Sequence, residues 1–171
     1  IAAISADHWS RGNGWGIIGL TELVRYLPKD HPFYAESVRR YKRHCAALLP
    51  YQTAHGLWRQ EITEELAWEE SSGSGMILYA YGVGLRLGLL DRAVYEPAFR
   101  KGIEGLTEHC MLADFSALHS CPGCLCPGNG SPKAYITEKI SFVNEPHAFG
   151  PMMMALTEAH LNGMTTLAWN K

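Results

Sequence analysis

Hydrophobic residues recur every three or four positions along most of the chain, which is the spacing of one buried face of an α-helix. The first such stretch covers residues 14–27 and ends where Pro28 cannot continue a helix. The second covers about 32–49 and ends at Pro50. Because only a short polar turn joins them, the two helices are predicted to form an antiparallel αα-hairpin.

The hairpin pattern returns in the middle of the chain. Ser71 or Ser72 can cap a helix that runs to about Leu90, and Asp91 can cap its return helix, which covers about 92–111. Five glycines in the first of these helices weaken its intrinsic propensity, so close packing against another helix or a ligand is expected there.

A long segment, 112–150, separates this hairpin from a last helix, which is predicted over about 151–161. The segment is rich in Cys, Pro, Gly and Ser, and a loop of this length in a compact domain is usually either functional or wrongly assigned as a loop. Hairpins and long loops therefore alternate along the chain. This order predicts an all-α fold with functional loops at one end.

Composition narrows the classes of function. The 171 residues are 47% hydrophobic and 19% charged, which fits one ordinary folded domain. A formal net charge of -2 argues against nucleic-acid binding, and no apolar run approaches the roughly 20 residues of a membrane-spanning helix. The chain begins at Ile1 without a signal-peptide pattern, so we expect a piece of a longer protein, whose localisation cannot be predicted.

The aromatic and basic segment 9–15 is the first candidate for chemistry. The planar guanidinium of Arg11 is suited to a carboxylate, and the flanking Trp9 and Trp15 offer flat walls for a sugar ring. The alternative is a helix-capping turn with core tryptophans and a structural arginine.

A second candidate, Glu69 and Glu70 followed by serines, precedes the third predicted helix. Paired carboxylates can act as general acid and base. Helix capping and a favourable helix dipole explain acidic residues and serines at this position equally well.

The cysteines offer a third candidate. Cys121, Cys124 and Cys126 follow His119, and three thiols with an imidazole could bind zinc. A second pair of ligands is not evident, so reduced thiols in a glycine-containing loop are the favoured interpretation. The total of five cysteines excludes a fully disulfide-paired monomer.

A fourth candidate, 144–151, is polar and aromatic and carries His147 just before the last predicted helix. His147 either forms its hydrogen bonds within the loop or contacts a ligand. Three of the four candidates precede a helix, so in a ring of αα-hairpins they would gather at one end. No Ser-His-Asp order, phosphate loop or dinucleotide fingerprint accompanies them.

Taken together, these segments resemble the unsaturated rhamnogalacturonyl hydrolases and the related unsaturated glucuronyl hydrolases. The resemblance runs in the family's order and spacing through WSRGNGW (9–15), LTEL (20–23), YLPKDHP (26–32), GLW (56–58), ESSGS (70–74) and NEPHAFGP (144–151). It implies an (α/α)6 toroid, of which residues 1–171 would form about the C-terminal half.

The resemblance also implies a reaction. Family members release a 4,5-unsaturated uronic acid from the non-reducing end of oligosaccharides left by polysaccharide lyases. An Asp protonates C4 of the enol ether, water adds at C5, and the hemiketal opens without a metal or organic cofactor. That Asp lies upstream of the Trp-x-Arg segment in the family, so no catalytic residue is assigned here; Asp7 and His8 have the wrong spacing to replace it.

Substrate binding is what the resemblance carries over to this chain. Trp9 and Trp15 are expected to wall the uronate site and Arg11 to orient its carboxylate or the +1 sugar, with Ser71, Ser72 and His147 at the rim. The expected partners are an unsaturated oligosaccharide, favoured as pectin-derived, and either the N-terminal half of the enzyme or a second copy to cover exposed apolar flanks. A non-catalytic binder of acidic glycans, an inactive fragment and another α/α-toroid enzyme such as an epimerase stay open.

Overall fold

A computed structural model of the chain describes residues 7–123, 143–164 and 166. Helices dominate this part, and a short 3-10 turn, Leu49–Tyr51, and a two-stranded antiparallel ribbon complete it. The elements are α1 (Ser10–Tyr26), α2 (Tyr34–Leu48), β1 (Trp58–Arg59), β2 (Glu69–Glu70), α3 (Ser71–Arg86), α4 (Arg92–His109) and α6 (Pro146–Leu161). None of the helices described is long and apolar enough to cross a membrane.

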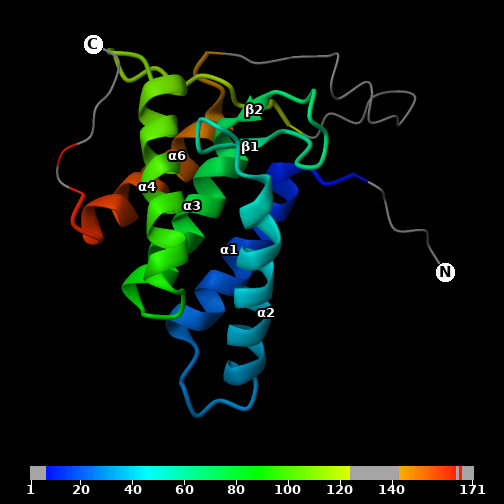
Figure 1. The fold of residues 1–171 in the computed structure, drawn as a ribbon, viewed down its shortest axis with the longest axis vertical. Coiled ribbons are helices and arrows are strands. Elements are labelled where there is room, and N and C mark those ends of the chain that lie inside the picture. Colours follow the sequence, from blue (N-terminus) through cyan, green and yellow to red (C-terminus); the bar gives the residue numbers. More distant parts are fainter. Residues whose placement is uncertain (1–6, 124–142, 165, 167–171) are drawn as a thin grey trace.

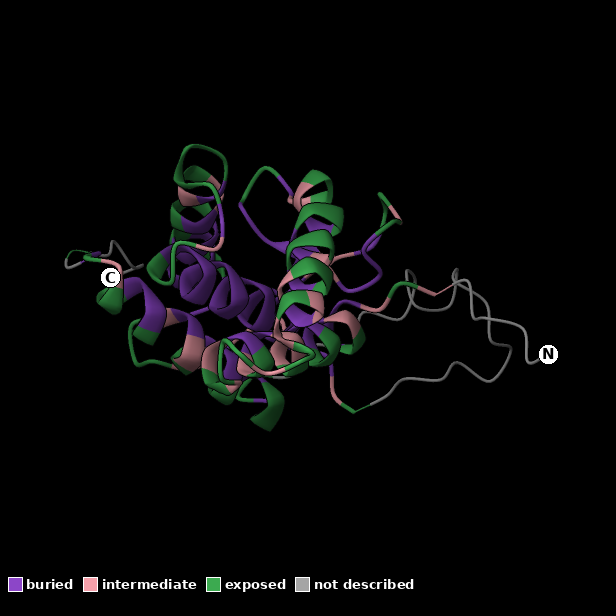
Figure 2. Cartoon of the chain, turned by 90° about the horizontal axis from the view of Figure 1, so that it is seen from below, coloured by how far each residue is buried: buried purple, intermediate pink, exposed green. Residues whose placement is uncertain are grey.

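Three helices, α1, α3 and α6, begin at the same end of the molecule and run in the same direction (Figure 1). Helices α2 and α4 return in the opposite direction and lie outside them. The central helix, α3, is buried from Ser71 to Leu85 because it packs between α1 and α6, and Figure 2 shows the buried residues gathered in the middle of the fold. Inner helices backed by outer ones form about half of an (α/α)6 toroid, as predicted.

Glycines allow the inner helices to approach closely, as their number in α3 predicted. A Cβ on Gly75 would lie 2.7 Å from the carbonyl carbon of Pro151 in α6, and one on Gly73 would lie 2.7 Å from the carbonyl carbon of Ser10 in α1. Real side chains essentially never approach backbone so closely. Both contacts therefore require glycine on α3.

We expect Gly75→Ala to lower the free energy of unfolding by about 1–3 kcal/mol, because the added methyl group must push α6 away. Urea denaturation measures this loss. Gly150→Ala is the matched control: Gly150 is also helical, but a Cβ at this position would meet nothing within 4 Å, so this variant should be neutral or slightly more stable. Equal effects of the two substitutions would contradict the packing argument.

Two helices begin earlier than predicted. Helix α1 begins at Ser10 rather than at residue 14, because the Ser10 amide donates to the carbonyl of Gln60 (2.8 Å) and the helix then continues without interruption. Helix α6 begins at Pro146 rather than Pro151, since proline fits the first turn of a helix and Glu145 caps it. Arg11 and His147 therefore lie in the first turns of α1 and α6, and Trp15 lies in the second turn of α1.

The cap of α3 was also predicted wrongly. Neither Ser71 nor Ser72 is the cap; the side chain of Glu70 accepts the amides of Ser72 and Gly73. The helix ends at Arg86 and not near Leu90, before Gly88 takes a positive φ of 67°. The predicted cap of α4 is confirmed, because the Asp91 carboxylate accepts the Ala93 amide at 2.9 Å.

Candidate functional site

Glu70 is the centre of a buried hydrogen-bond network at the end of the half-ring where α1, α3 and α6 begin. Its carboxylate is fully buried and accepts hydrogen bonds from several elements. The donors are the Ser72 amide (3.1 Å) and hydroxyl (2.7 Å), the Gly73 amide (2.6 Å), the Cys121 amide (3.0 Å) and the Ser10 hydroxyl (3.3 Å). These contacts show that Glu70 caps α3, which was the alternative to acid-base chemistry for this residue.

Arg11 lies beside this network and is 1% exposed. Its Nη1 donates to the Ser72 hydroxyl (3.2 Å) and to the carbonyl of Cys121, and its Nη2 donates to the carbonyl of Gly123 (3.2 Å). The guanidinium lies over the ring of Trp9, 4.8 Å from its centroid. Arg11 therefore ties α1 to α3 and to the segment that follows Ser120.

The two predicted rim serines are both buried in this network. The Ser72 hydroxyl donates to Glu70 and accepts from Arg11, whereas the Ser71 hydroxyl has no hydrogen-bond partner within the described ranges. The buried Trp9 indole nitrogen likewise has no acceptor in that part of the chain. Each of these two groups can still bind water or a ligand.

Trp15 and His147 are the two predicted site residues that are open to solvent. Trp15 on α1 is 58% exposed, so it is not a core tryptophan. The His147 side chain is 44% exposed, and its Nδ1 lies 2.7 Å from the Glu145 carboxylate. Burial alone would raise the pKa of Glu145, but the hydrogen bonds and charge of His147 lower it overall, so this carboxylate is ionised and orients the imidazole.

A groove of about 600 Å³ lies between α1, α3 and α6. It is lined by Ile18, Glu22, Arg25, Tyr79, Met153, Met154, Thr157, Glu158 and Leu161. Helical periodicity places Trp15 one turn above Ile18, and His147 two turns above Met154, on the faces that line this groove. The groove therefore leads up to the end of the half-ring at which Trp15 and His147 lie.

Polar contacts across the groove join the inner helices. The Tyr79 hydroxyl donates to Glu22 and accepts from Arg25, and Arg86 forms a bidentate pair with Glu158 at 2.8 and 2.9 Å. Burial, followed by the hydrogen bond to Glu22, raises the pKa of Tyr79 to about 12, so the phenol stays protonated. Sequence reasoning missed this network; the Glu22–Arg25 spacing was its only local signal.

The cysteine segment is described only as far as Gly123, and Cys124 and Cys126 lie outside the described residues. Burial raises the pKa of the Cys121 thiol to about 11, so the thiol is protonated at neutral pH. Its sulfur lies 3.8 Å from the Gln60 side-chain amide. Among the residues that the structure covers, no group of three or more potential ligands stands ready for a metal ion.

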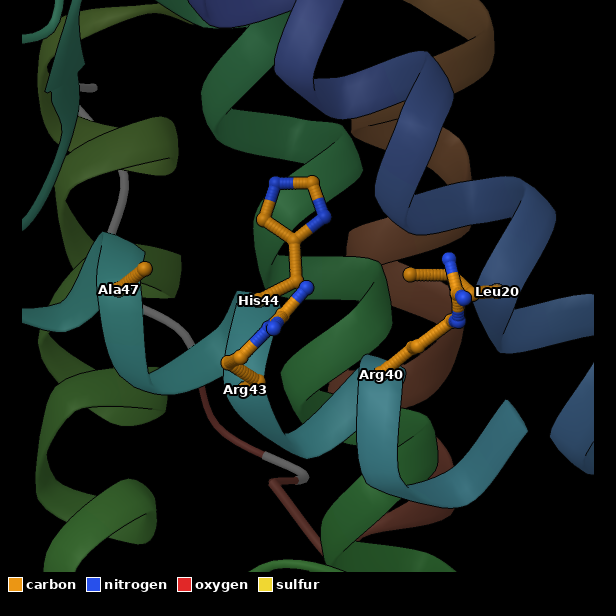
Figure 3. A pocket seen from close by; sticks show the side chains of 5 residues that line it. All are labelled: Leu20, Arg40, Arg43, His44 and Ala47. Carbon is orange, nitrogen blue, oxygen red and sulfur yellow. The ribbon is translucent and has the colours of Figure 1, made fainter. Parts of the chain in front are cut away.

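A basic pocket of about 320 Å³ lies between α1 and α2 (Figure 3). It is lined by Leu20, Arg40, Arg43, His44 and Ala47. Arg40 is paired with Glu36 at 2.6 Å, and burial lowers the pKa of His44. All five lining residues belong to α1 and α2.

Comparison with known sequences agrees with the fold. The model of Glycosyl Hydrolase Family 88 matches residues 2–162. An unsaturated 3S-rhamnoglycuronyl hydrolase of Formosa agariphila is 36% identical over 108 residues, which are 62% of this chain and 28% of that protein. A 24.9 kDa protein in the picA locus of Rhizobium radiobacter is 31% identical over 169 residues, covering 90% of this chain and 72% of the relative.

Solved structures show the same arrangement of helices. A family 88 glycosyl hydrolase from Bacteroides vulgatus superimposes with a TM-score of 0.75 at 20% identity, over 89% of this chain and 42% of that structure. A family 105 glycoside hydrolase from C. acetobutylicum superimposes with a TM-score of 0.78 at 26% identity, over 92% of this chain and 47% of that structure. This chain thus spans less than half of these structures, which confirms the predicted half-toroid. By its fold and by a family match over most of its length, the chain belongs to glycosyl hydrolase family 88.

Proposed function

We propose that this chain forms the substrate-holding half of an unsaturated glycuronyl hydrolase. Family membership and the similarity to a rhamnoglycuronyl hydrolase support the reaction class. The observation that carries the proposal is the groove that leads from the inner helices to the exposed Trp15 and His147. A lyase-derived oligosaccharide with an unsaturated uronic acid at its non-reducing end, of the pectin type, is the proposed substrate.

The proposed reaction is hydration of the enol ether. A proton adds to C4 of the unsaturated ring and the hydroxyl of a water molecule adds to C5. The resulting hemiketal opens, and the bond to the remaining sugar breaks as that sugar leaves with its hydroxyl restored. The carboxyl group that delivers the proton is proposed to come from outside this chain, because the chain spans only part of its relatives.

In this scheme the residues of this chain bind and orient the substrate. The exposed indole of Trp15 stacks on a sugar face, and the imidazole of His147, oriented by Glu145, hydrogen-bonds to a hydroxyl. Arg11, whose two terminal nitrogens already donate to protein atoms, acts by holding the 121–123 segment in place at the rim. Trp9, Ser71 and Ser72 lie at the starts of α1 and α3, at the same end of the half-ring.

The remaining half of the toroid is the proposed macromolecular partner. On α1, Leu23 and Tyr26 are exposed at 45% and 69%, and Arg43 and its neighbours make the pocket between α1 and α2 basic. A further αα-hairpin with carboxylates opposite these arginines would cover the apolar residues and neutralise the charge.

The function is tested by following the ultraviolet absorbance of the substrate double bond in the complete enzyme. We expect the absorbance of an unsaturated disaccharide to disappear, and Trp15→Ala to weaken substrate binding about tenfold through the loss of one stacking wall. Phe33→Ala is the control, because Phe33 is similarly exposed at 68% but lies in the turn between α1 and α2, at the opposite end of α1 from Trp15. Saturable binding with undiminished absorbance would support the non-catalytic alternative instead.

A further inference from the structure

A further cavity, of about 240 Å³, is lined mainly by histidines. Its walls are His55, Leu57, Glu69, His109 and His119, which come from the loop before β1, from β2, from the end of α4 and from the segment after it. None of these residues lines the groove of the proposed active site. The cavity is therefore a separate cluster of imidazoles and a carboxylate.

The loop that carries His55 is held firmly against α4. A Cβ on Gly105 would lie 2.0 Å from the His55 carbonyl oxygen, and one on Gly56 would lie 2.4 Å from the Lys101 carbonyl oxygen. The Gln52 side-chain amide also donates to the carbonyl of Ala98 at 2.8 Å. Because two backbones meet at glycines here, the position of His55 relative to α4 is fixed by packing.

Glu69 orients the His55 ring. Its carboxylate lies 2.9 Å from His55 Nδ1. An ionised carboxylate only accepts, so His55 Nδ1 carries a proton, and in the neutral ring Nε2 keeps a free lone pair. In metal sites a carboxylate commonly accepts the second ring N–H of a ligating histidine in this way and so fixes its orientation.

His109 supplies a second imidazole next to the first. The centroids of the two rings are 4.2 Å apart, with the planes tilted by 39°. Both rings line the same cavity, and imidazole nitrogen suits Zn²⁺, Cu²⁺ and Ni²⁺, so the two side chains are candidate ligands of one ion. The part of the chain that the structure describes holds no set of three ligands already in place, so water must complete the coordination.

We propose that His55 and His109, supported by Glu69, form a binding site for a divalent transition-metal ion. The ion would join the loop before β1 to the C-terminal end of α4, and so would stabilise the end of the half-ring that carries the candidate active site. The site does not depend on the proposed hydrolase reaction.

The test is calorimetric titration of the metal-free protein with Zn²⁺. We expect one saturable equivalent, at least about tenfold weaker binding in His109→Gln, and a smaller loss in Glu69→Gln. His160→Gln is the control, because His160 is an exposed histidine at the end of α6 and should bind as the parent does. Circular dichroism checks that each variant is folded.

Nuclear magnetic resonance provides the second measurement. The imidazole signals of His55 and His109 should shift together as Zn²⁺ is added, while the His160 signal should not. Unchanged affinity in His109→Gln, shifts confined to other histidines, or the absence of saturable binding would each overturn the proposal.

Discussion

Glu70→Ala is expected to destabilise the protein by about 4 kcal/mol or more. The substitution removes the cap of α3 and leaves buried donors from Ser10, Ser72, Gly73 and Cys121 without their acceptor. A lost cap costs about 1 kcal/mol, and each buried donor left unpaired costs about 1–3 kcal/mol unless water reaches it. Thermal or urea denaturation measures the loss.

Glu65→Ala is the matched control for this prediction, since Glu65 precedes the same helix but is exposed and should change stability by less than about 0.5 kcal/mol. Glu70→Gln should lie between the two, because the amide keeps one acceptor oxygen and turns an NH₂ group toward donors. A stability of Glu70→Ala close to that of the parent protein would show that the network around Glu70 contributes little to the fold.

Arg11→Met is expected to lower both stability and turnover. Removal of the guanidinium leaves the buried carbonyl of Cys121 and the Ser72 hydroxyl without this donor, which should cost about 2–4 kcal/mol. In the complete enzyme, the displaced 121–123 segment should reduce turnover at least about tenfold. Arg39→Met is the control, because Arg39 is an exposed arginine that pairs with Glu36 on its own helix.

The two measurements together separate two roles of Arg11. If Arg11 positions the 121–123 segment, its replacement lowers the melting temperature and the turnover together. Arg11→Lys should then restore neither, since one ammonium group cannot reach all the acceptors that the planar guanidinium binds. If stability stayed unchanged while turnover fell, Arg11 would contact the substrate directly. Unchanged stability and turnover would remove Arg11 from the site altogether.

Local sequence determined which segments are helical, because the spacing of apolar residues shows which stretches can bury one face. It also identified the Asp91 cap, since that carboxylate binds an amide only two residues away. The starts of α1 and α6 were placed too late. For α1, the helix begins where Ser10 meets the carbonyl of Gln60, and no local pattern contains that contact.

The same division holds for the site. The sequence alone singled out Trp15 and His147 as candidate binding residues, from their residue types and their nearness to predicted helix starts. Arg11 was open to two interpretations, a substrate ligand or a structural arginine, because its partners Cys121 and Gly123 lie more than a hundred positions away in the chain. Only the tertiary structure decided that its guanidinium is buried and already hydrogen-bonded to protein atoms.

The groove and the histidine cavity were beyond sequence reasoning for the same reason. Tyr79 meets Glu22 from another helix, and His55 meets His109 because glycines let a loop approach α4. The sequence by itself determined the helices, the family and the residues available for chemistry. Which of those residues are buried, paired or open was decided by packing between distant segments, because hydrogen bonds and burial depend on neighbours in space and not along the chain.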